Sequence, residues 1–282
     1  RMESGRISVE LLTAPGQRTA DNVAGEINRH NNERKSIDRE ITQEALEMVQ
    51  NGQCLASDNV TIVYNPNWNK GIIGIVASRL VEKFYRPTIV LTRSTDGLIT
   101  GSARSIKEFN IYEGINDCSD LLEHFGGHKF AAGLSLKEEN LDTFIQKFEE
   151  FVCNNLSDDS FIPEINVDME LDLSSITVDF VKNLNRFAPF GPGNMAPIFL
   201  SRRVVEEGNG KIVGEKHIKM RVLYRNKASQ PIDAIAFNLK EHFADISAKK
   251  DFDLLYHVEE NTWNNLTNIQ LNVKDIRLSE DE

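Results

Sequence analysis

The sequence predicts an α/β domain that follows a long helix and precedes a mainly β domain. Apolar residues recur at helical spacing from Thr19 to about Gln50, and strand patterns alternate with helix patterns from about Leu55 to Leu156. After Pro163 short β-rich runs dominate. The length of 282 residues also favours two domains, at roughly 100 to 200 residues per domain.

The composition is that of an ordinary globular chain with an acidic total. Hydrophobic residues make up 40% and charged residues 27%, which argues against disorder and a membrane barrel. No apolar stretch approaches the roughly 18 to 20 residues of a membrane span and the amino end shows no signal segment, so we expect a cytoplasmic protein. Cys54, Cys118 and Cys153 form no CxxC pair, which indicates reduced thiols.

The first predicted element is one long helix. Its apolar stripe is interrupted by the polar segment 29–35, which suits a helix that crosses open space between two bodies. Asn51 and Gly52 readily adopt the left-handed cap conformation and are predicted to end the helix. Two shorter helices with a kink are the alternative.

The α/β region is predicted from three short β-branched runs and two helical patterns. The first helical pattern, Ile72 to Phe84, follows the first strand, and the second, around Leu141 to Val152, closes the region. This order implies a sheet with a helix on one face. The predicted strands are Val60 to Tyr64, Pro87 to Thr92 and Leu98 to Ala103.

The last region is predicted to be a small β barrel or sandwich. Its strands are short, closely spaced and separated by turns rich in Gly and Asn, and Val178 to Phe187 has a helical pattern. The predicted strands are Val167 to Leu173, Ile198 to Glu206, Gly210 to Val213, His217 to Tyr224, Ile232 to Phe237, Phe252 to Glu259 and Asn268 to Arg277.

Two segments of the α/β region carry candidates for phosphate binding. Gly126 and Gly127 permit close approach of backbone N–H groups to an anion, and His128 adds a donor. The alternative is a glycine turn that joins a helix to a strand, with the histidine bonding local backbone groups. A zinc site made by His124 and His128 is disfavoured, because the glycines interrupt the helix that this spacing requires.

The second candidate segment is a strand end with one arginine. Arg104, flanked by Ser102 and Ser105, offers donors that recognise phosphate or carboxylate, at a position where α/β sheets gather ligands. Segment 67–74 opens a helix after a strand, where anions bind, but its glycines are better explained by close packing on the sheet.

The net charge of −11 conceals a basic segment. Between Arg186 and Lys240, ten Lys or Arg oppose four Asp or Glu, a net of +6, so the rest of the chain carries −17. Cations for phosphates with rings for bases are typical of single-strand binding surfaces; a solvated strand face is the alternative. The candidate cations are Arg202, Arg203, Lys211, Lys216, His217, Lys219 and Arg221, and the candidate rings are Phe237, Tyr256 and Trp263.

In their order along the chain, these motifs resemble the RecJ exonuclease family. Segments 1–7 and 28–45 are similar to the end of its catalytic domain and to the helix that joins its two catalytic domains. WNKGIIGIVASRL, GSARS and GGHKFAAG resemble the signatures of a DHHA1 domain, although Ser-Gly-Arg-Ser is typical where GSARS stands. FAPFGPGNMAPIF, HIKM, IDAIAF and segment 261–273 resemble a RecJ-type OB domain.

The resemblance implies a division of the chain and a function. We expect the end of a DHH domain at 1–18, a linker helix at 19–54, an α/β DHHA1 domain at 55–160 and an all-β OB-fold barrel at 161–282. The whole would be the substrate-gripping part of a 5′ to 3′ single-stranded DNA exonuclease of recombination and repair. Its Mn²⁺ or Mg²⁺ site would lie in an upstream DHH domain, since this chain contains no Asp-His-His, so the chain would bind no metal, supply no catalytic residue and be inactive alone.

By the same resemblance, Arg104, His128 and the backbone of Gly126 and Gly127 would hold a strand phosphate, assisted by Ser102 and Ser105, while the basic OB residues bind more of the strand. We expect a monomer whose partners are single-stranded DNA, a single-strand-binding protein and a helicase, with no membrane contact. Two alternatives are an oligonucleotide or cyclic-dinucleotide phosphodiesterase, which the carboxyl-terminal β region disfavours, and a non-catalytic single-strand-binding module.

Overall fold

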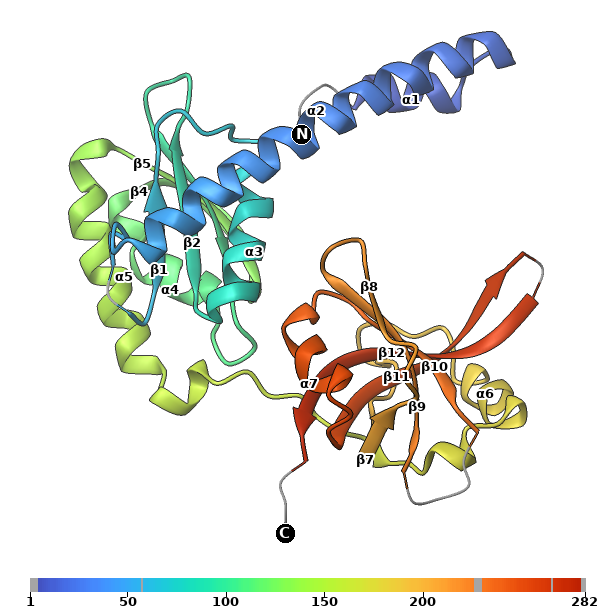
Figure 1. Ribbon diagram of the computed structural model, residues 1–282. Coiled ribbons are helices and arrows are strands. Elements are labelled where there is room, and N and C mark those ends of the chain that lie inside the picture. The colour runs from blue at the N-terminus through green and yellow to red at the C-terminus, as the bar shows by residue number, and fades with distance from the viewer. Residues whose placement is uncertain (1–4, 57, 226–229, 265, 280–282) are drawn as a thin grey trace. The chain divides into compact units, whose positions relative to one another are not determined.

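The structure is a computed structural model, and it describes residues 5–56, 58–225, 230–264 and 266–279. The chain forms two compact units, Arg1–Pro163 and Glu164–Glu282 (Figure 1). None of the helices within the described ranges is long and apolar enough to cross a membrane.

The first unit begins with a short helix, α1 (Arg6–Leu12), followed by one long helix, α2 (Gln17–Gln50). The prediction of a single helix is confirmed, and Gly52, with φ +70°, follows its last turn. Most side chains of the polar segment 29–35 are exposed, whereas Ile41 and Ala45 in the carboxyl half are buried. The carboxyl half of α2 is therefore the part that packs on the sheet domain.

The sheet of the first unit has five strands in the order β1-β2-β3-β5-β4, with β1 and β2 parallel and the other pairs antiparallel. Strands β1 (Thr61–Tyr64), β2 (Thr88–Arg93) and β3 (Ile99–Arg104) lie where the sequence predicts strands. Strands β4 (Leu122–His128) and β5 (Ala131–Leu136) were not predicted. β4 is an exposed edge strand of polar and small residues, so it lacks the apolar alternation that marks a strand in a sequence.

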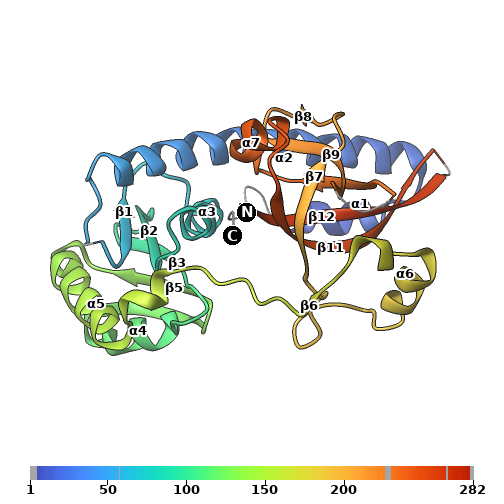
Figure 2. The same cartoon turned by 60° about the horizontal axis from the view of Figure 1, so that its bottom comes forward.

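Helices cover both faces of this sheet, rather than one face as predicted. Helix α3 (Ile73–Phe84) lies with α2 on one side, and α4 (Ile111–Asp117) and α5 (Leu141–Asn155) lie on the other (Figure 2). Each side has its own apolar cluster. Single 3-10 turns occur at Ser119–Leu121, Glu138–Asn140 and Asp158–Phe161 in this unit, and at Leu173–Ser175 and Lys240–His242 in the second.

The second unit is a barrel rather than a sandwich. Five strands close a ring in the order β7-β9-β10-β12-β11, in which β10 and β12 are parallel and a β7–β9 pairing completes the circle. This closure, with α7 between β10 and β11 in the chain, is the connectivity of an OB fold. The elements are β6 (Met169–Glu170), α6 (Val178–Asn185), β7 (Phe199–Glu206), β8 (Lys211–Val213), β9 (His217–Tyr224), β10 (Ile232–Ala236), α7 (Phe243–Ser247), β11 (Phe252–Trp263) and β12 (Leu266–Leu278).

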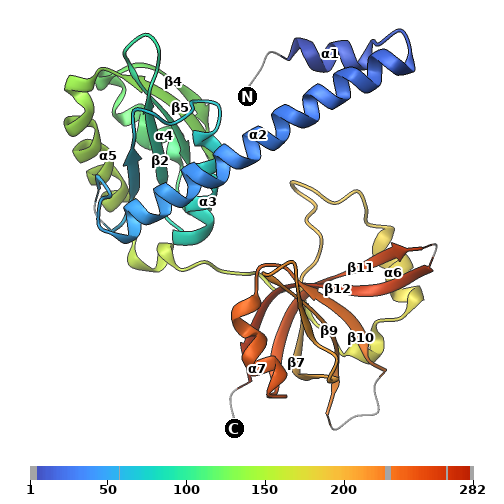
Figure 3. The same ribbon diagram turned by 45° about the horizontal axis from the view of Figure 1, so that its top comes forward.

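Three strands of the second unit differ clearly from their predicted lengths. The strand predicted at Val167 to Leu173 is reduced to β6, which pairs with β7 over two residues. Strands β11 and β12 run on as a hairpin beyond the barrel (Figure 3), because β7 pairs with β11 only up to Tyr256. The core inside the ring contains alternate residues of each strand, such as Ile218, Met220 and Val222 of β9.

A buried carboxylate joins α2 to α3. The Asp38 side chain is only 4% exposed, and its Oδ2 accepts a hydrogen bond from Arg79 Nη2 at 2.8 Å. Thr42 donates to Asp38 Oδ1 at 3.3 Å and accepts from Arg79 Nη1 at 3.3 Å. Hydrogen bonds to a charged group contribute about 1.5 to 3 kcal/mol, so this triad fastens the long helix to the sheet domain.

We expect Asp38→Ala to lower the unfolding free energy of the first unit by about 2 kcal/mol, because Arg79 and Thr42 lose their shared partner. The measurement is urea unfolding followed by the fluorescence of Trp68, which is buried with Ile41 and Ala45 of α2 in one apolar cluster. A Trp263→Phe background removes the other tryptophan signal. Glu33→Ala is the control, because it removes the exposed Arg29–Glu33 pair, and its effect should stay within about 0.5 kcal/mol. Equal effects of the two substitutions would contradict the role given to Asp38.

Candidate functional site

The register of three strands brings the two predicted phosphate motifs together. Arg104 of β3 lies opposite Ala131 of β5, and Ala131 in turn lies opposite His128 of β4. Residues opposite one another in neighbouring strands project from the same face of a sheet. Arg104 and His128 therefore share one face, on either side of a small residue.

A second row runs parallel to the first. Ser102 lies opposite Gly133, and Gly133 lies opposite Gly126, so these three also belong to the face that carries Arg104. Alternate residues of a strand share a face. The face thus combines polar side chains on β3 and β4 with Ala and Gly on the strand between them.

The outer part of this face is open. Helix α3 covers β2 and β3, and α2 contacts β1, so Val63 and Val90 are buried in the apolar cluster beneath these helices. Gly126, His128 and Gly133, by contrast, are exposed. The β5–β4 part is therefore a surface of backbone and small side chains that a ligand can approach closely.

A hollow of roughly 400 Å³ lies between this face and the start of α3. Arg104 Nη1 donates to Ser102 Oγ at 3.1 Å and to the Ala103 carbonyl at 2.7 Å, which holds the guanidinium in place at its edge. Two further polar side chains line the hollow, Lys70 from the turn before α3 and Ser78 from α3, and neither was named as a candidate from the sequence. The lining residues are Lys70, Gly71, Gly74, Ile75, Ser78, Arg79, Glu82, Ser102 and Arg104.

Gly74 lets α3 approach the arginine motif. A Cβ atom at this position would lie 2.9 Å from Ser102 Oγ and 3.0 Å from Arg104 Nη2. The expectation that the glycines of segment 67–74 serve close packing is confirmed at this residue. The packing partner is the candidate site itself, so Gly74 also sets the width of the hollow.

The two glycines of the histidine motif have different roles. Gly127 has φ +155°, and a Cβ atom there would lie 2.3 Å from the Ala131 carbonyl oxygen, so the fold requires glycine. Gly126 has no atom within 4 Å of a Cβ position. Both lie within β4, so the alternative of a glycine turn between a helix and a strand is wrong for the glycines, whereas its expectation that the histidine bonds the local backbone is confirmed.

The hydrogen bonds of His128 and Ser105 separate their roles. His128 Nδ1 accepts the Phe130 backbone N–H at 3.2 Å, so the neutral ring carries its proton on Nε2, from which it can donate to an anion. The Ser105 hydroxyl donates to the Phe109 carbonyl at 2.9 Å and stabilises the loop after β3. The structure therefore aligns Ser102, but not Ser105, with Arg104 and His128.

The site residues fit an anion and not a divalent metal. His124 and His128 lie on a strand, so a helical ligand spacing does not apply to them. Within the described residues no group of three or more His, Cys, Asp or Glu side chains could hold a metal ion. The donors on this face are a guanidinium, an imidazole and hydroxyls, which suit phosphate oxygens.

On the barrel, part of the predicted basic set forms an exposed face. Lys219 projects outward from β9 and lies directly opposite Lys211 of β8, and Lys216 is in the turn between them. No described residue forms an ion pair with any of these three lysines. Like charges directly opposite each other destabilise a sheet, so an anion bound between them would relieve a repulsion that the fold itself leaves in place.

Aromatic residues near this face are fewer than predicted. Phe237 is 51% exposed, and its ring centroid lies 5.2 Å from that of His217, whose Nδ1 accepts the Asn238 N–H. Tyr256, by contrast, is fully buried in the barrel core and its hydroxyl is bonded to Ser201, so its prediction as a surface ring is wrong. The Trp263 side chain lies outside the described residues.

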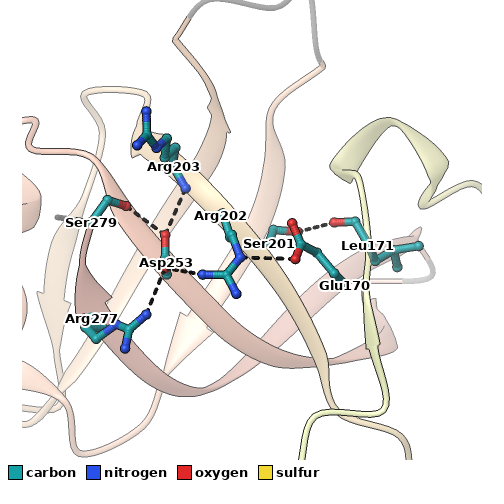
Figure 4. A network of polar contacts seen from close by, with 8 residues as sticks. All are labelled: Glu170, Leu171, Ser201, Arg202, Arg203, Asp253, Arg277 and Ser279. Atoms are coloured by element: carbon teal, nitrogen blue, oxygen red, sulfur yellow. Dashed lines mark hydrogen bonds and ion pairs between the residues drawn. The ribbon is translucent and has the colours of Figure 1, made fainter. Parts of the chain in front are cut away.

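The three arginines of the basic set are paired with carboxylates or lie beside them. Arg221 Nη1 is 2.9 Å from Glu207. Arg202 bonds Glu170 at 3.0 Å and Asp253 at 3.3 Å, and the Arg203 backbone N–H donates to Asp253 at 3.1 Å (Figure 4). Arg202 and Arg203 thus belong to a network on β7 that is distinct from the lysine face on β8 and β9.

Asp253 is the centre of this network. The buried carboxylate also accepts from Ser279 Oγ at 2.7 Å and from Arg277 at 3.4 Å, so it joins β7, β11 and β12 (Figure 4). Burial alone would raise its pKa, but the hydrogen bonds from Ser279, the Arg203 backbone and Arg277, with the charge of Arg202, outweigh this and lower the pKa below its ordinary value.

Both units match models of known domain families. The model of the DHHA1 domain matches residues 57–154, which contain the β3–β5–β4 face. The model of the RecJ OB domain matches residues 167–275, which contain the barrel.

The similar curated proteins are single-stranded-DNA-specific exonucleases named RecJ. The protein of Bacillus subtilis (strain 168) is 38% identical over 282 residues, which cover 99% of this chain and 35% of that protein. The protein of Escherichia coli (strain K12) is 29% identical, with coverage of 98% and 48%. A crystal structure of RecJ with Mn²⁺ from Thermus thermophilus shares the fold, with TM-score 0.76, 22% identity and coverage of 98% and 39%. The chain spans between about a third and a half of the length of these relatives.

We expect Asp253→Asn to lower the melting temperature of the barrel unit at pH 7, measured by scanning calorimetry. A carboxylate whose folded pKa lies below its unfolded value near 3.8 stabilises the protein above that pH, and the contribution is lost as the pH falls through the folded pKa. The difference between variant and wild type should therefore shrink below about pH 4. Asp179→Asn, at an exposed carboxylate, is the control, and a pH-independent difference would contradict the assignment.

Proposed function

Since its paired DHHA1 and RecJ OB domains place this chain in the RecJ family, we propose that it is the strand-binding part of a 5′ to 3′ single-stranded DNA exonuclease. The observation that carries the proposal is the shared face of Arg104 and His128, two donors from separate motifs that flank Ala131 where the covered part of the sheet meets the open β5–β4 part. The hydrolytic chemistry belongs to a Mn²⁺ or Mg²⁺ centre outside the described residues.

Arg104 and His128 hold one phosphate of the strand between them. The guanidinium is already oriented by Ser102 and the Ala103 carbonyl, so little side-chain freedom is lost when it binds. His128 donates from Nε2, and Gly126, in the next row along the strand, leaves space for the adjoining part of the nucleotide to approach the backbone. Donors fixed in this way position the neighbouring scissile bond and stabilise charge that develops on it.

The barrel holds a further part of the strand. Lys211, Lys216 and Lys219 supply charge to phosphates, and Phe237 beside His217 offers a ring on which a base can stack. In an OB fold the second and third ring strands and the first connecting loop bind oligonucleotides, and here these are β9, β10 and the β7–β9 connection that contains β8. Arg202 stabilises the barrel instead, and Arg203 contributes its backbone N–H to the same network.

In the full-length enzyme, we expect Arg104→Ala and His128→Ala each to lower turnover of single-stranded DNA by about 10² or more, because each removes a positioned donor. Circular dichroism should be unchanged, because His128 is exposed and Arg104 is only half-buried, at the edge of the hollow. Lys147→Ala, which removes a cation paired with Asp120 on the α5 side of the sheet, should leave turnover unchanged. Activity within about threefold of wild type for either site variant would show that its side chain does not hold the phosphate.

For the chain itself, we expect binding of oligothymidylate, measured by fluorescence anisotropy, to weaken about tenfold when Lys211 and Lys219 are both changed to Ala. The slope of log affinity against log salt should fall by about 1.4, at about 0.7 for each lost phosphate contact. The control is the double change Lys182→Ala and Lys250→Ala, at lysines that have carboxylate partners. An unchanged slope in the Lys211 and Lys219 double variant would place the strand elsewhere.

A further inference from the structure

A second hollow, of roughly 350 Å³, lies beside the phosphate candidates on the same sheet face. His124, Ser135 and Thr100 form the row that precedes Gly126, Gly133 and Ser102, as the pairings of β4 with β5 and of β5 with β3 show. This row lies about 13 Å along the strands from Arg104 and His128, at about 3.3 Å per residue. Lys70 lines both hollows.

The floor of this hollow is a pair of glycines that the fold does not require. Gly126 and Gly133 lie directly opposite each other, and neither has a left-handed φ. A Cβ atom at Gly126 would have no atom within 4 Å, and one at Gly133 would meet only the Gly101 carbonyl at 3.8 Å. Glycine inside a strand costs about 0.5 to 1 kcal/mol and often marks a place where a ligand approaches the backbone.

The rim of the hollow carries both donors and acceptors. Lys70 and His124 can donate, and neither has an ion-pair partner within the described part of the chain. Asp96 is exposed, and its Oδ1 accepts the Leu98 N–H at 3.1 Å, which leaves Oδ2 for another donor. With an acceptor among its donors, this rim suits a mixed partner better than a second phosphate. The edge of a nucleobase, which presents donors and acceptors together, is such a partner.

We propose that this hollow is a nucleoside subsite, which takes the base and sugar adjoining the phosphate held by Arg104 and His128. The flat ring lies on the peptide groups of Gly126 and Gly133, with half-buried Leu98 as an apolar wall. Asp96 and His124 contact the base edge, and Lys70 lies between base and phosphate. The inference rests on the proposed function, because the phosphate subsite places the nucleoside.

The test compares thymidine 5′-monophosphate with 2-deoxyribose 5-phosphate, which lacks the base, on the full chain by amide NMR. Both ligands should shift the His128 amide, and only the nucleotide should also shift the amides of Gly133, Lys70 and Ser135. The nucleotide should bind at least fivefold more tightly. Equal affinities, or nucleotide shifts confined to His128, would overturn the subsite.

Variants separate the subsite from the proposed function. Gly133→Ala has room for its methyl group, so the fold should persist, and it should reduce the nucleotide preference to within about twofold without changing the affinity for deoxyribose phosphate. Asp96→Ala, on an exposed turn, should act in the same direction. Arg104→Ala should weaken both ligands equally. If Gly133→Ala and Asp96→Ala keep the full preference, the subsite is wrong; if Arg104→Ala changes neither affinity, the proposed phosphate site is wrong as well.

Discussion

The pairing of β3, β5 and β4 is the constraint on which the first unit depends. Because each strand of this group is antiparallel to its neighbour, Arg104 and His128 come from motifs distant in the chain and yet lie in one row across Ala131. A shift of one residue in either pairing would move one of these side chains to the opposite face, where α4 and α5 pack. Gly127 fixes the register of the edge strand, since its Cβ position is occupied by β5. The phosphate proposal and the nucleoside subsite both follow from this alignment.

Glycine serves three separate purposes around this face. Gly127 allows two strands to pair, Gly74 allows a helix to approach a strand, and the opposed pair Gly126 and Gly133 has no steric cause within the protein. A side chain at Gly127 or Gly74 would clash with neighbouring atoms, whereas one at Gly126 or Gly133 would extend into open space. A glycine that the packing of the protein does not require is therefore the better indicator of function, because a bound ligand can be the reason that the position has no side chain.

In the second unit, basic residues either stabilise the fold or remain available to a ligand, according to whether a carboxylate lies beside them. Arg202 pairs with Asp253 and stabilises the barrel, while Lys211 and Lys219 face each other without a carboxylate partner among the described residues. Paired charges close to a buried carboxylate keep the fold together, and charges left in mutual repulsion are available to phosphates. The separation of these roles follows from the strand on which each cation lies, since β7 borders Asp253 of β11 and β9 borders β8.

What could be predicted from the sequence depended on whether a feature is set by a local pattern or by pairings between distant strands. Local patterns were sufficient for α2, α3, β1 to β3 and most barrel strands, because periodic burial leaves a periodic sequence. The phosphate motifs could be named because Arg104 and His128 carry their chemistry in their own side chains. β4 could not be predicted, since an exposed edge strand needs no apolar alternation, and the pairing of Arg202 with Asp253 could not, since the two are 51 positions apart. Tyr256 was misassigned because an aromatic ring on a strand has the same sequence signature whether it faces the core or the solvent. Only the register decides the face, so the arrangement of a site on a sheet depends on pairings between strands that no single segment encodes.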